Sequence, residues 1–285
     1  MAIEDYSEVD FQNALAAQVI RLTRHVSPCR SSSVAYLTGG QPGSGKAAFQ
    51  GLSKTEQNGN LIIIEADAFR SLHPNYDVLA QQFGKDSVIK TQEFSGALAE
   101  ALIMRLSDDG YNLLIEGTLR TTTVLRQTAG LLHSKGYTVE LLIMAVKPII
   151  SYVSTIERYE RMLAVNPETA RATPKEHHDR VVKSLCPNLR ELHAKGVFDT
   201  IRLYNRALKL LYSSVDTPNI DPSGVLRGVM DGSWAKEETD IVCHSIQEIY
   251  ALMESRGIQG TDDWKTVEHL AAKIEAVLPP PSLRL

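Results

Sequence analysis

A glycine-rich segment at residues 39–48 has the residue types that bind phosphate. Gly40, Gly45 and Lys46 follow the spacing G-x-x-x-x-G-K, in which backbone N–H groups converge on a di- or triphosphate. Glycines let the backbone curl tightly, and the N-terminus of the following helix adds its positive dipole. Lys46 is placed to reach the β- and γ-phosphates. We therefore predict a nucleotide-binding loop formed by Gly40, Gln41, Pro42, Gly43, Ser44, Gly45, Lys46 and Ala47.

The loop departs from its usual pattern at one position. The residue after the lysine is normally Ser or Thr, whose hydroxyl ligates Mg²⁺, whereas this chain has Ala47. Water can take the place of the hydroxyl, but Mg²⁺ demands nearly octahedral geometry. We expect a cation that is held less well and a slower reaction, in a chain that still folds.

The elements around the loop alternate between strand and helix. Short apolar runs predict strands at 34–38, 61–67, 112–118, 139–146 and 200–205. Helical spacing with start and stop signals predicts helices at 11–26, 94–106, 124–135, 148–164 and 173–187, and another that opens at 47. This order indicates an α/β fold of the P-loop NTPase type, a parallel sheet flanked by helices whose ligands bind at the carboxyl ends of the strands.

The pattern changes after about residue 215. Loops and two helices, at 235–255 and 262–277, replace the alternation of strands and helices. We therefore divide the chain into a kinase-like core at 1–215, which includes the N-terminal helix, and a small C-terminal helical extension at 216–285.

Composition narrows the classes of partner. A chain of 285 residues with a formal net charge of −4 gives no overall electrostatic reason to expect nucleic acid. The three cysteines are far apart, which argues against a zinc site or a disulfide framework and fits a reducing compartment. The N-terminus is acidic and no apolar run approaches 18 residues. We expect a cytoplasmic protein without a membrane partner.

Two acids follow predicted strands. Asp67 ends the second strand, which we expect beside the phosphate loop, where a carboxylate can accept the proton of an attacking hydroxyl. The alternative is that Asp67 caps a short helix. Glu116 ends the third strand, where it can hold Mg²⁺ directly or through water. The alternative for Glu116 is a solvated strand end.

Arginines follow the fourth strand. Arg158 and Arg161 lie on the predicted helix at 148–164, and Arg171 lies in a loop-rich segment that could close over a nucleotide. An arginine brought onto the transferring phosphoryl group stabilises its charge, although most surface arginines only solvate a face. His177 and His178 are expected on an exposed helix, and we assign them no role.

Several motifs together resemble the zeta toxin family, the toxin half of bacterial epsilon/zeta toxin–antitoxin systems. The resemblance runs from about residue 11 to 214 and is weaker in the C-terminal helices. Its motifs are G-G-Q-P-G-S-G-K at 39–46, F-x-x-x-H-P-N-Y-D at 69–77, R-L-S-D-D-G-Y-N-L-L-I-E-G-T at 105–118, T-I-E-R-Y-E at 155–160, T-A-R-A-T-P-K at 169–175 and I-R-L-Y-N-R at 201–206.

The resemblance implies a specific activity. Zeta toxins use ATP and Mg²⁺ to phosphorylate the 3′-hydroxyl of UDP-N-acetylglucosamine, which starves cell-wall synthesis, and an epsilon-type antitoxin protein binds them. By motif match, Lys46 carries the nucleotide phosphates, Asp67 is the base, and Arg158 and Arg171 clamp the γ-phosphate. The matched substrate-binding residues are Asp67, Glu100, Glu116, Thr118, Arg120 and Thr128.

Ala47 keeps two further interpretations open. Where the family has Thr or Ser, this chain has no hydroxyl, so the kinase is expected to be attenuated. The chain could instead be a catalytically silent zeta-like protein that binds nucleotide sugar and antitoxin. It could also be a P-loop kinase that acts on another small molecule.

Overall fold

A six-stranded sheet forms the centre of the chain. The computed structural model describes residues 2–29, 31–167 and 170–278, and its strand order is β2-β3-β1-β4-β5-β6. The first five strands run parallel, and β6 runs antiparallel to β5 at one edge. The strands are β1 (Val34–Gly39), β2 (Ile62–Ile64), β3 (Leu113–Ile115), β4 (Thr138–Met144), β5 (Thr200–Tyr204) and β6 (Leu210–Ser213).

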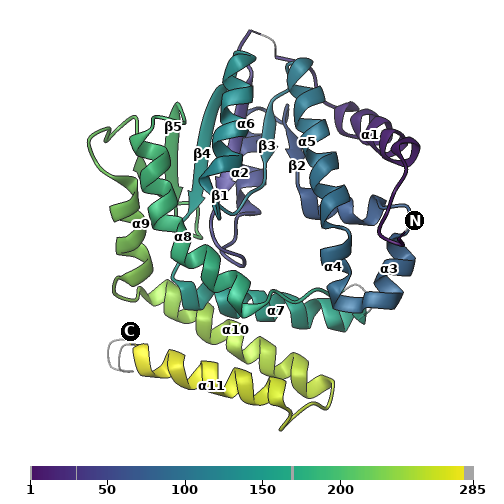
Figure 1. Ribbon diagram of the computed structural model, residues 1–285. Helices are drawn as coiled ribbons and strands as arrows, with labels where there is room; N and C mark the ends of the chain where they lie inside the picture. The colour runs from purple at the N-terminus through teal and green to yellow at the C-terminus, as the bar shows by residue number, and fades with distance from the viewer. Residues whose placement is uncertain (1, 30, 168–169, 279–285) are drawn as a thin grey trace.

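Helices cover both faces of this sheet (Figure 1). Alternate residues of β4 point to opposite faces, so Leu141 and Ile143 join one buried cluster while Leu142 and Met144 join the other. The first cluster is covered by α1 (Glu8–Thr23), α5 (Gln92–Asp108), α6 (Thr122–Ser134), α8 (Lys175–Ala194) and α9 (Pro222–Asp231). The second is covered by α2 (Ala48–Glu56), α7 (Pro148–Val165), α10 (Lys236–Ser255) and α11 (Asp262–Val277). The α/β fold of the P-loop type is thus confirmed.

The two C-terminal helices lie beyond α7, with α10 running along it (Figure 1). Buried charges join both ends of α7 to α10 and the residue that follows it. Lys147, the residue before α7, is 4% exposed and its Nζ lies 3.6 Å from a carboxylate oxygen of Glu238. Near the other end, Glu160 is 3% exposed and forms an ion pair with Arg256. The position of α7 therefore depends on α10.

Several elements differ from those predicted. Strand β6 and helix α9 were missed, as were the short elements after β2, namely η1 (Ala66–Leu72), α3 (Tyr76–Phe83), η2 (Gly84–Asp86) and α4 (Ser87–Lys90). The prediction that a helix ends near Pro187 was wrong, because α8 continues to Ala194. Proline removes one backbone hydrogen bond, but Leu185, Leu189 and Leu192 bury one side of this helix and hold it together. No described helix is long and apolar enough to cross a membrane.

Candidate active site

The predicted phosphate loop joins β1 to α2 and curls against α7. Gly40, Gly43 and Gly45 have φ values of 140°, 75° and 97°, which side chains rarely allow. A Cβ atom on Gly43 would lie 2.1 Å from the backbone oxygen of Ser151 in α7. Glycine at this position therefore lets the loop sit directly on the first turns of α7, as Figure 1 also indicates.

The interior of the loop is polar. Lys46 Nζ donates to the backbone oxygens of Gly40 and Gln41, at 2.9 and 3.1 Å. The side-chain oxygens of Gln41 and Ser44 are buried and have no hydrogen-bond partner among the described residues. Buried polar atoms without partners are costly, so the loop has polar groups that a bound anion or its water can satisfy.

The Lys46 side chain has a lowered pKa. Burial lowers the pKa of this lysine from 10.5 to about 8, and the positive charge of Arg158 lowers it further. The carboxylates of Glu116 and Asp67 act in the opposite direction. These three side chains come from α7, from the residue after β3 and from η1, so the fold brings four of the predicted site residues into one electrostatic cluster.

Position 47 lies where the loop becomes helix α2. Ala47 precedes the first residue of the helix and makes no side-chain capping hydrogen bond. Its methyl group is exposed. Because residue 47 is alanine, the start of α2 has no side-chain oxygen where the usual pattern has one.

Two carboxylates lie at the ends of neighbouring parallel strands. Ile64 pairs with Ile115 at the end of β2 and β3, so Glu65 and Glu116 follow at the same edge of the sheet. Burial raises the pKa of Glu65, and repulsion from Glu116 and Asp67 adds to this increase. Glu65 was not among the predicted site residues, although its place in an acid-tipped strand could have indicated it.

Asp67 lies elsewhere than predicted. Strand β2 ends at Ile64, and β3 separates it from β1, so the prediction that Asp67 ends the strand beside the phosphate loop was wrong. The helix-cap alternative is also wrong, because Glu65 is the residue that precedes η1. The Asp67 side chain is 65% exposed and Arg70 donates to its Oδ1 at 2.6 Å. An exposed carboxylate held from one side remains accessible to an acceptor.

The predicted arginines separate into two groups. Arg158 Nη2 donates to Thr173 Oγ1 at 3.1 Å, which joins α7 to the segment that carries Arg171. The charges of Arg158 and Arg171 both act on the Glu65 carboxyl group and lower its pKa. Arg161 instead bonds to Glu157 and Glu248 in α7 and α10.

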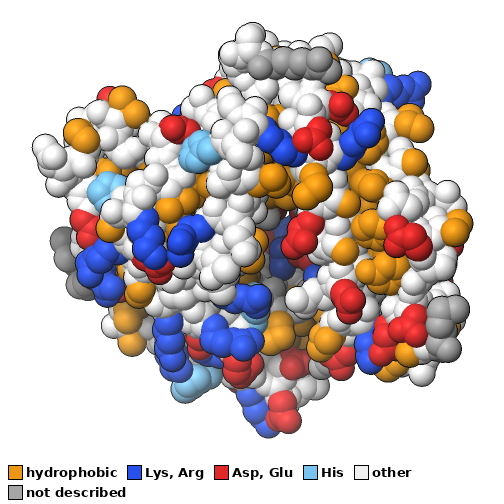
Figure 2. Space-filling model, turned by 45° about the horizontal axis from the view of Figure 1, so that its top comes forward, with side chains coloured by type: hydrophobic (Ala, Val, Ile, Leu, Met, Phe, Trp, Pro, Cys, Tyr) orange, Lys and Arg blue, Asp and Glu red, His pale blue; other side chains and the backbone are white. Residues whose placement is uncertain are grey.

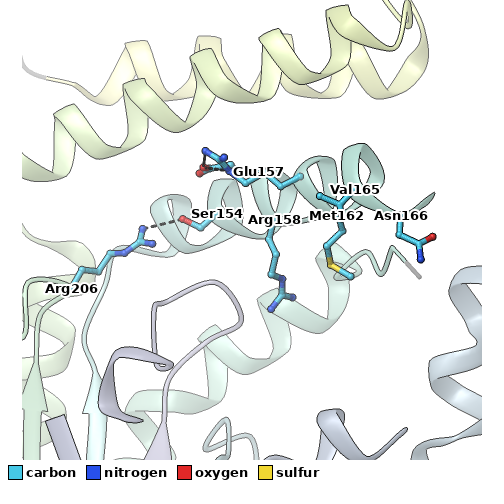
Figure 3. A pocket seen from close by; sticks show the side chains of 8 residues that line it. Ser154, Glu157, Arg158, Met162, Val165, Asn166 and Arg206 are labelled. Atoms are coloured by element: carbon cyan, nitrogen blue, oxygen red, sulfur yellow. Dashed lines mark hydrogen bonds and ion pairs between the residues drawn. The ribbon is translucent and has the colours of Figure 1, made fainter. Parts of the chain in front are cut away.

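A pocket of about 510 Å³ lies along α7 (Figure 3). Arg206, which follows β5, donates to Ser154 Oγ at 2.9 Å across one end of it, and its Nε would lie 3.6 Å from a Cβ atom on Gly45. The pocket is lined by Ser154, Glu157, Arg158, Arg161, Met162, Val165, Asn166 and Arg206. It therefore adjoins the phosphate loop and combines cationic with apolar walls.

The remaining predicted residues lie around this cluster at different distances. The N–H of Gly40 approaches the backbone oxygen of Thr118 to 3.5 Å, so Thr118 adjoins the loop. Arg120 is exposed. Burial lowers the pKa of His177, and the positive charge of Arg120 lowers it further. Glu100 is exposed on α5 and Thr128 is half-buried on α6. Figure 2 shows a hollow on one face of the molecule, with basic and acidic side chains around it.

The expectation that His178 is exposed was wrong. It is 1% exposed, and its Nε2 lies 2.8 Å from Ser151 Oγ. The backbone oxygen of the same residue, Ser151, abuts Gly43 in the phosphate loop. His178 therefore joins α8 to the part of α7 that supports the phosphate loop.

Comparison with known proteins identifies the family. The model of the zeta toxin family matches residues 19–216. The chain belongs to the zeta toxin family. Toxin zeta of Streptococcus agalactiae is 43% identical over 278 residues, which cover 98% of this chain and 94% of that protein. Members of this family are toxins of the kinase type.

Solved structures agree with this assignment. A structure of the PezAT chromosomal toxin–antitoxin system of Streptococcus pneumoniae matches with a TM-score of 0.83 and 40% identity, and covers 88% of this chain and 100% of that one. A structure of the AvrRxo1-ORF1:-ORF2 complex with ATP matches with a TM-score of 0.52 at 13% identity, over 86% of this chain and 81% of that one. This second likeness concerns the fold alone.

Proposed function

We propose that this zeta toxin transfers the γ-phosphate of ATP to the 3′-hydroxyl of UDP-N-acetylglucosamine. The observation that carries the proposal is the electrostatic cluster around Lys46. Lys46 lies inside the phosphate loop, and the charges of Arg158, Glu116 and Asp67 act on its ammonium. The Asp67 side chain is exposed. Phosphoryl transfer needs cations on the phosphates and a group that orients the attacking hydroxyl. Family membership supports the same reaction.

The nucleotide fits the loop and the adjoining pocket. Backbone N–H groups at 40–47 and Lys46 would bind the phosphates, and the unpartnered oxygens of Ser44 and Gln41 would bond to them through hydroxyl rotation or water. Arg206 and the apolar side chain of Met162 line a pocket next to the loop, which suits a ribose and a base. Arg158, which lines the same pocket, and Arg171 would hold the γ-phosphate.

The donor set at the strand ends fits Mg²⁺. This cation binds one or two carboxylates together with substrate phosphates and water, and Glu116 supplies such a carboxylate, with Glu65 beside it. When bound, Mg²⁺ neutralises charge on the phosphates. Asp67 would accept the proton of the attacking hydroxyl. Its pairing with Arg70 fixes one side of the carboxylate and leaves the other side to the acceptor.

The sugar nucleotide would bind on the side of the cluster opposite α7. We assign Asp67, Glu116, Thr118 and Arg120 to its binding, because they lie at or near the ends of β2 and β3. Glu100 and Thr128 are assigned to the same pocket on the basis of the family motif. The three widely spaced cysteines fit a reducing compartment, and we place the protein in the cytoplasm.

An antitoxin is the proposed protein partner. The PezAT structure is that of a toxin–antitoxin system. We propose that an epsilon-type antitoxin places a helix over the nucleotide entrance and excludes ATP. Titration of such a partner while ATP binding is followed tests this model, because additive binding would contradict it.

Because Ala47 lacks the hydroxyl that ligates Mg²⁺, we propose that the enzyme is slow. Loss of one well-placed electrostatic contact typically slows a reaction by about 10²–10³-fold. Ala47→Thr should therefore raise kcat by that factor and lower the Mg²⁺ requirement, with little change in sugar nucleotide affinity. The measurement is the rate at several Mg²⁺ concentrations. An unchanged rate and Mg²⁺ dependence would favour a silent binding protein.

The deciding experiment supplies ATP, Mg²⁺ and UDP-N-acetylglucosamine and follows the phosphorylated sugar nucleotide by mass spectrometry. A slow product that Asp67→Asn abolishes supports the proposal. Binding of the sugar nucleotide without product indicates a silent zeta-like protein. Neither binding nor product indicates a kinase for another small molecule.

A further inference from the structure

A glutamine in the first part of α2 reaches across to the strand-end carboxylate. Gln50 Nε2 donates to Glu116 Oε1 at 2.9 Å, although the two residues are 66 positions apart in the chain. A carboxylate only accepts hydrogen bonds, so the amide nitrogen of Gln50 must face it. The bond therefore links the helix that follows the phosphate loop to the end of β3.

The spacing of Gln50 relates it to position 47. Residues three apart on a helix lie on the same side of it, so Gln50 lies one turn beyond Ala47 on the side that faces the end of β3. Ala47 has only a methyl group. Gln50 therefore provides a polar group on the side of α2 where Ala47 has only a methyl group.

Glu116 needs such a partner to keep one orientation. Its N–H is fixed by the backbone oxygen of Ile64 at 2.9 Å, but its side chain is only half-buried. Its charge raises the pKa of both Lys46 and Glu65. Attraction to Lys46 and repulsion from Glu65 act over a distance and favour no single rotamer, whereas the directional hydrogen bond from Gln50 fixes one carboxylate oxygen.

We propose that Gln50 is a positioning residue that orients Glu116 toward Mg²⁺ and so partly compensates for the hydroxyl missing at position 47. This inference rests on the proposed use of ATP and Mg²⁺. It predicts that the chain retains more activity than the loss of the hydroxyl alone would leave. It also predicts that the effects of positions 47 and 50 depend on each other.

The test is a double-mutant cycle with Gln50→Met and Ala47→Thr. Methionine preserves length and removes the donor. Mn²⁺ affinity is measured by electron paramagnetic resonance in the presence of a non-hydrolysable ATP analogue and no acceptor. Gln50→Met should weaken Mn²⁺ binding about tenfold, the low end for a hydrogen bond to a charged group, and raise the Mg²⁺ needed for half-maximal rate equally. In the Ala47→Thr background the same change should cost less than about threefold.

A matched control lies on α1, where Gln12 Nε2 donates to Glu8 Oε1 at 2.8 Å. Gln12→Met should leave Mn²⁺ affinity unchanged, and thermal unfolding of both variants shows whether each still folds. Unchanged Mn²⁺ affinity in Gln50→Met, or an equal loss in both backgrounds, would overturn the inference. If UDP-N-acetylglucosamine proves not to be the acceptor, the Mn²⁺ measurement still tests the role of Gln50. If the unmodified chain does not bind Mn²⁺ with the ATP analogue, both the proposed function and the role of Gln50 are overturned.

Discussion

Nucleotide binding should weaken as the pH rises above about 8. In the free protein the pKa of Lys46 is about 8, so the lysine loses its proton above that pH. A bound polyphosphate stabilises the ammonium and raises its pKa again. Binding above pH 8 must therefore take up a proton, and the affinity for ATP should fall about tenfold per pH unit up to roughly pH 10.

Calorimetry measures this directly. Titration of ATP at about pH 9 in two buffers of different ionisation enthalpy should report uptake of about one proton per nucleotide, and much less at about pH 7. Lys46→Met should bind ATP more weakly at neutral pH and show no such dependence. The phosphates of ATP are already ionised over this range. An affinity of the unmodified chain that stays constant from pH 7 to 10, or one that falls equally in Lys46→Met, would refute the reasoning.

Stability should change with pH in the opposite direction. Because the folded-state pKa of Lys46 lies below the ordinary value of 10.5, the unfolded chain binds more protons between these two values. The free energy of unfolding of the wild type should therefore rise relative to Lys46→Met between about pH 8 and 10.5. The full difference is about 3 kcal/mol, which denaturant titrations at several pH values can measure.

Asp67→Asn keeps the shape of the side chain but loses its basicity, so single-turnover rates should fall by about 10²–10⁴-fold while ATP affinity changes little; a loss of stability without a loss of rate would contradict this role. Gly43→Ala should abolish ATP binding and lower the free energy of unfolding by about 2 kcal/mol or more. Gly51→Ala in α2 is the control: its added Cβ meets nothing within 4 Å, so it should raise the free energy of unfolding by about 0.5–1 kcal/mol. Arg256→Met leaves the buried carboxylate of Glu160 unpaired and should cost about 3 kcal/mol of stability, which Glu160→Leu in the same chain should largely restore; a cost that persists in the double variant would show that the ion pair is not its cause.

Regular elements were the most predictable part of the fold. Helix α7 was expected at 148–164 and is found at Pro148–Val165, because a proline starts it and its apolar spacing is continuous. Strand β6 is four residues long and pairs only at an edge, so its sequence has no pattern distinct from that of a loop. The course of α8 through Pro187 depends on side chains of the first core cluster, which no local pattern reveals.

The site was predictable in its residue types and less so in its geometry. The phosphate loop follows from its own spacing, since glycines with positive φ and a lysine at fixed offsets define it. The strand order does not follow from the sequence. We expected β2 beside β1, but β3 lies between them. Glu65 and Gln50 escaped prediction because their importance depends on which strand ends and helices are neighbours. The roles assigned to the catalytic and substrate-binding residues stay predictions, as does the domain division at residue 215.

The C-terminal helices influence the proposed site through α7. This helix carries Arg158, supports Gly43 with the backbone of Ser151, and binds Arg206 through Ser154. Buried charges join its two ends to Glu238 in α10 and to Arg256, the residue that follows α10. A displacement of α10 would therefore move an arginine, a wall of the phosphate loop and a wall of the adjoining pocket together. For this reason we propose that α10 is needed for catalytic geometry, although every predicted catalytic residue lies before it in the chain.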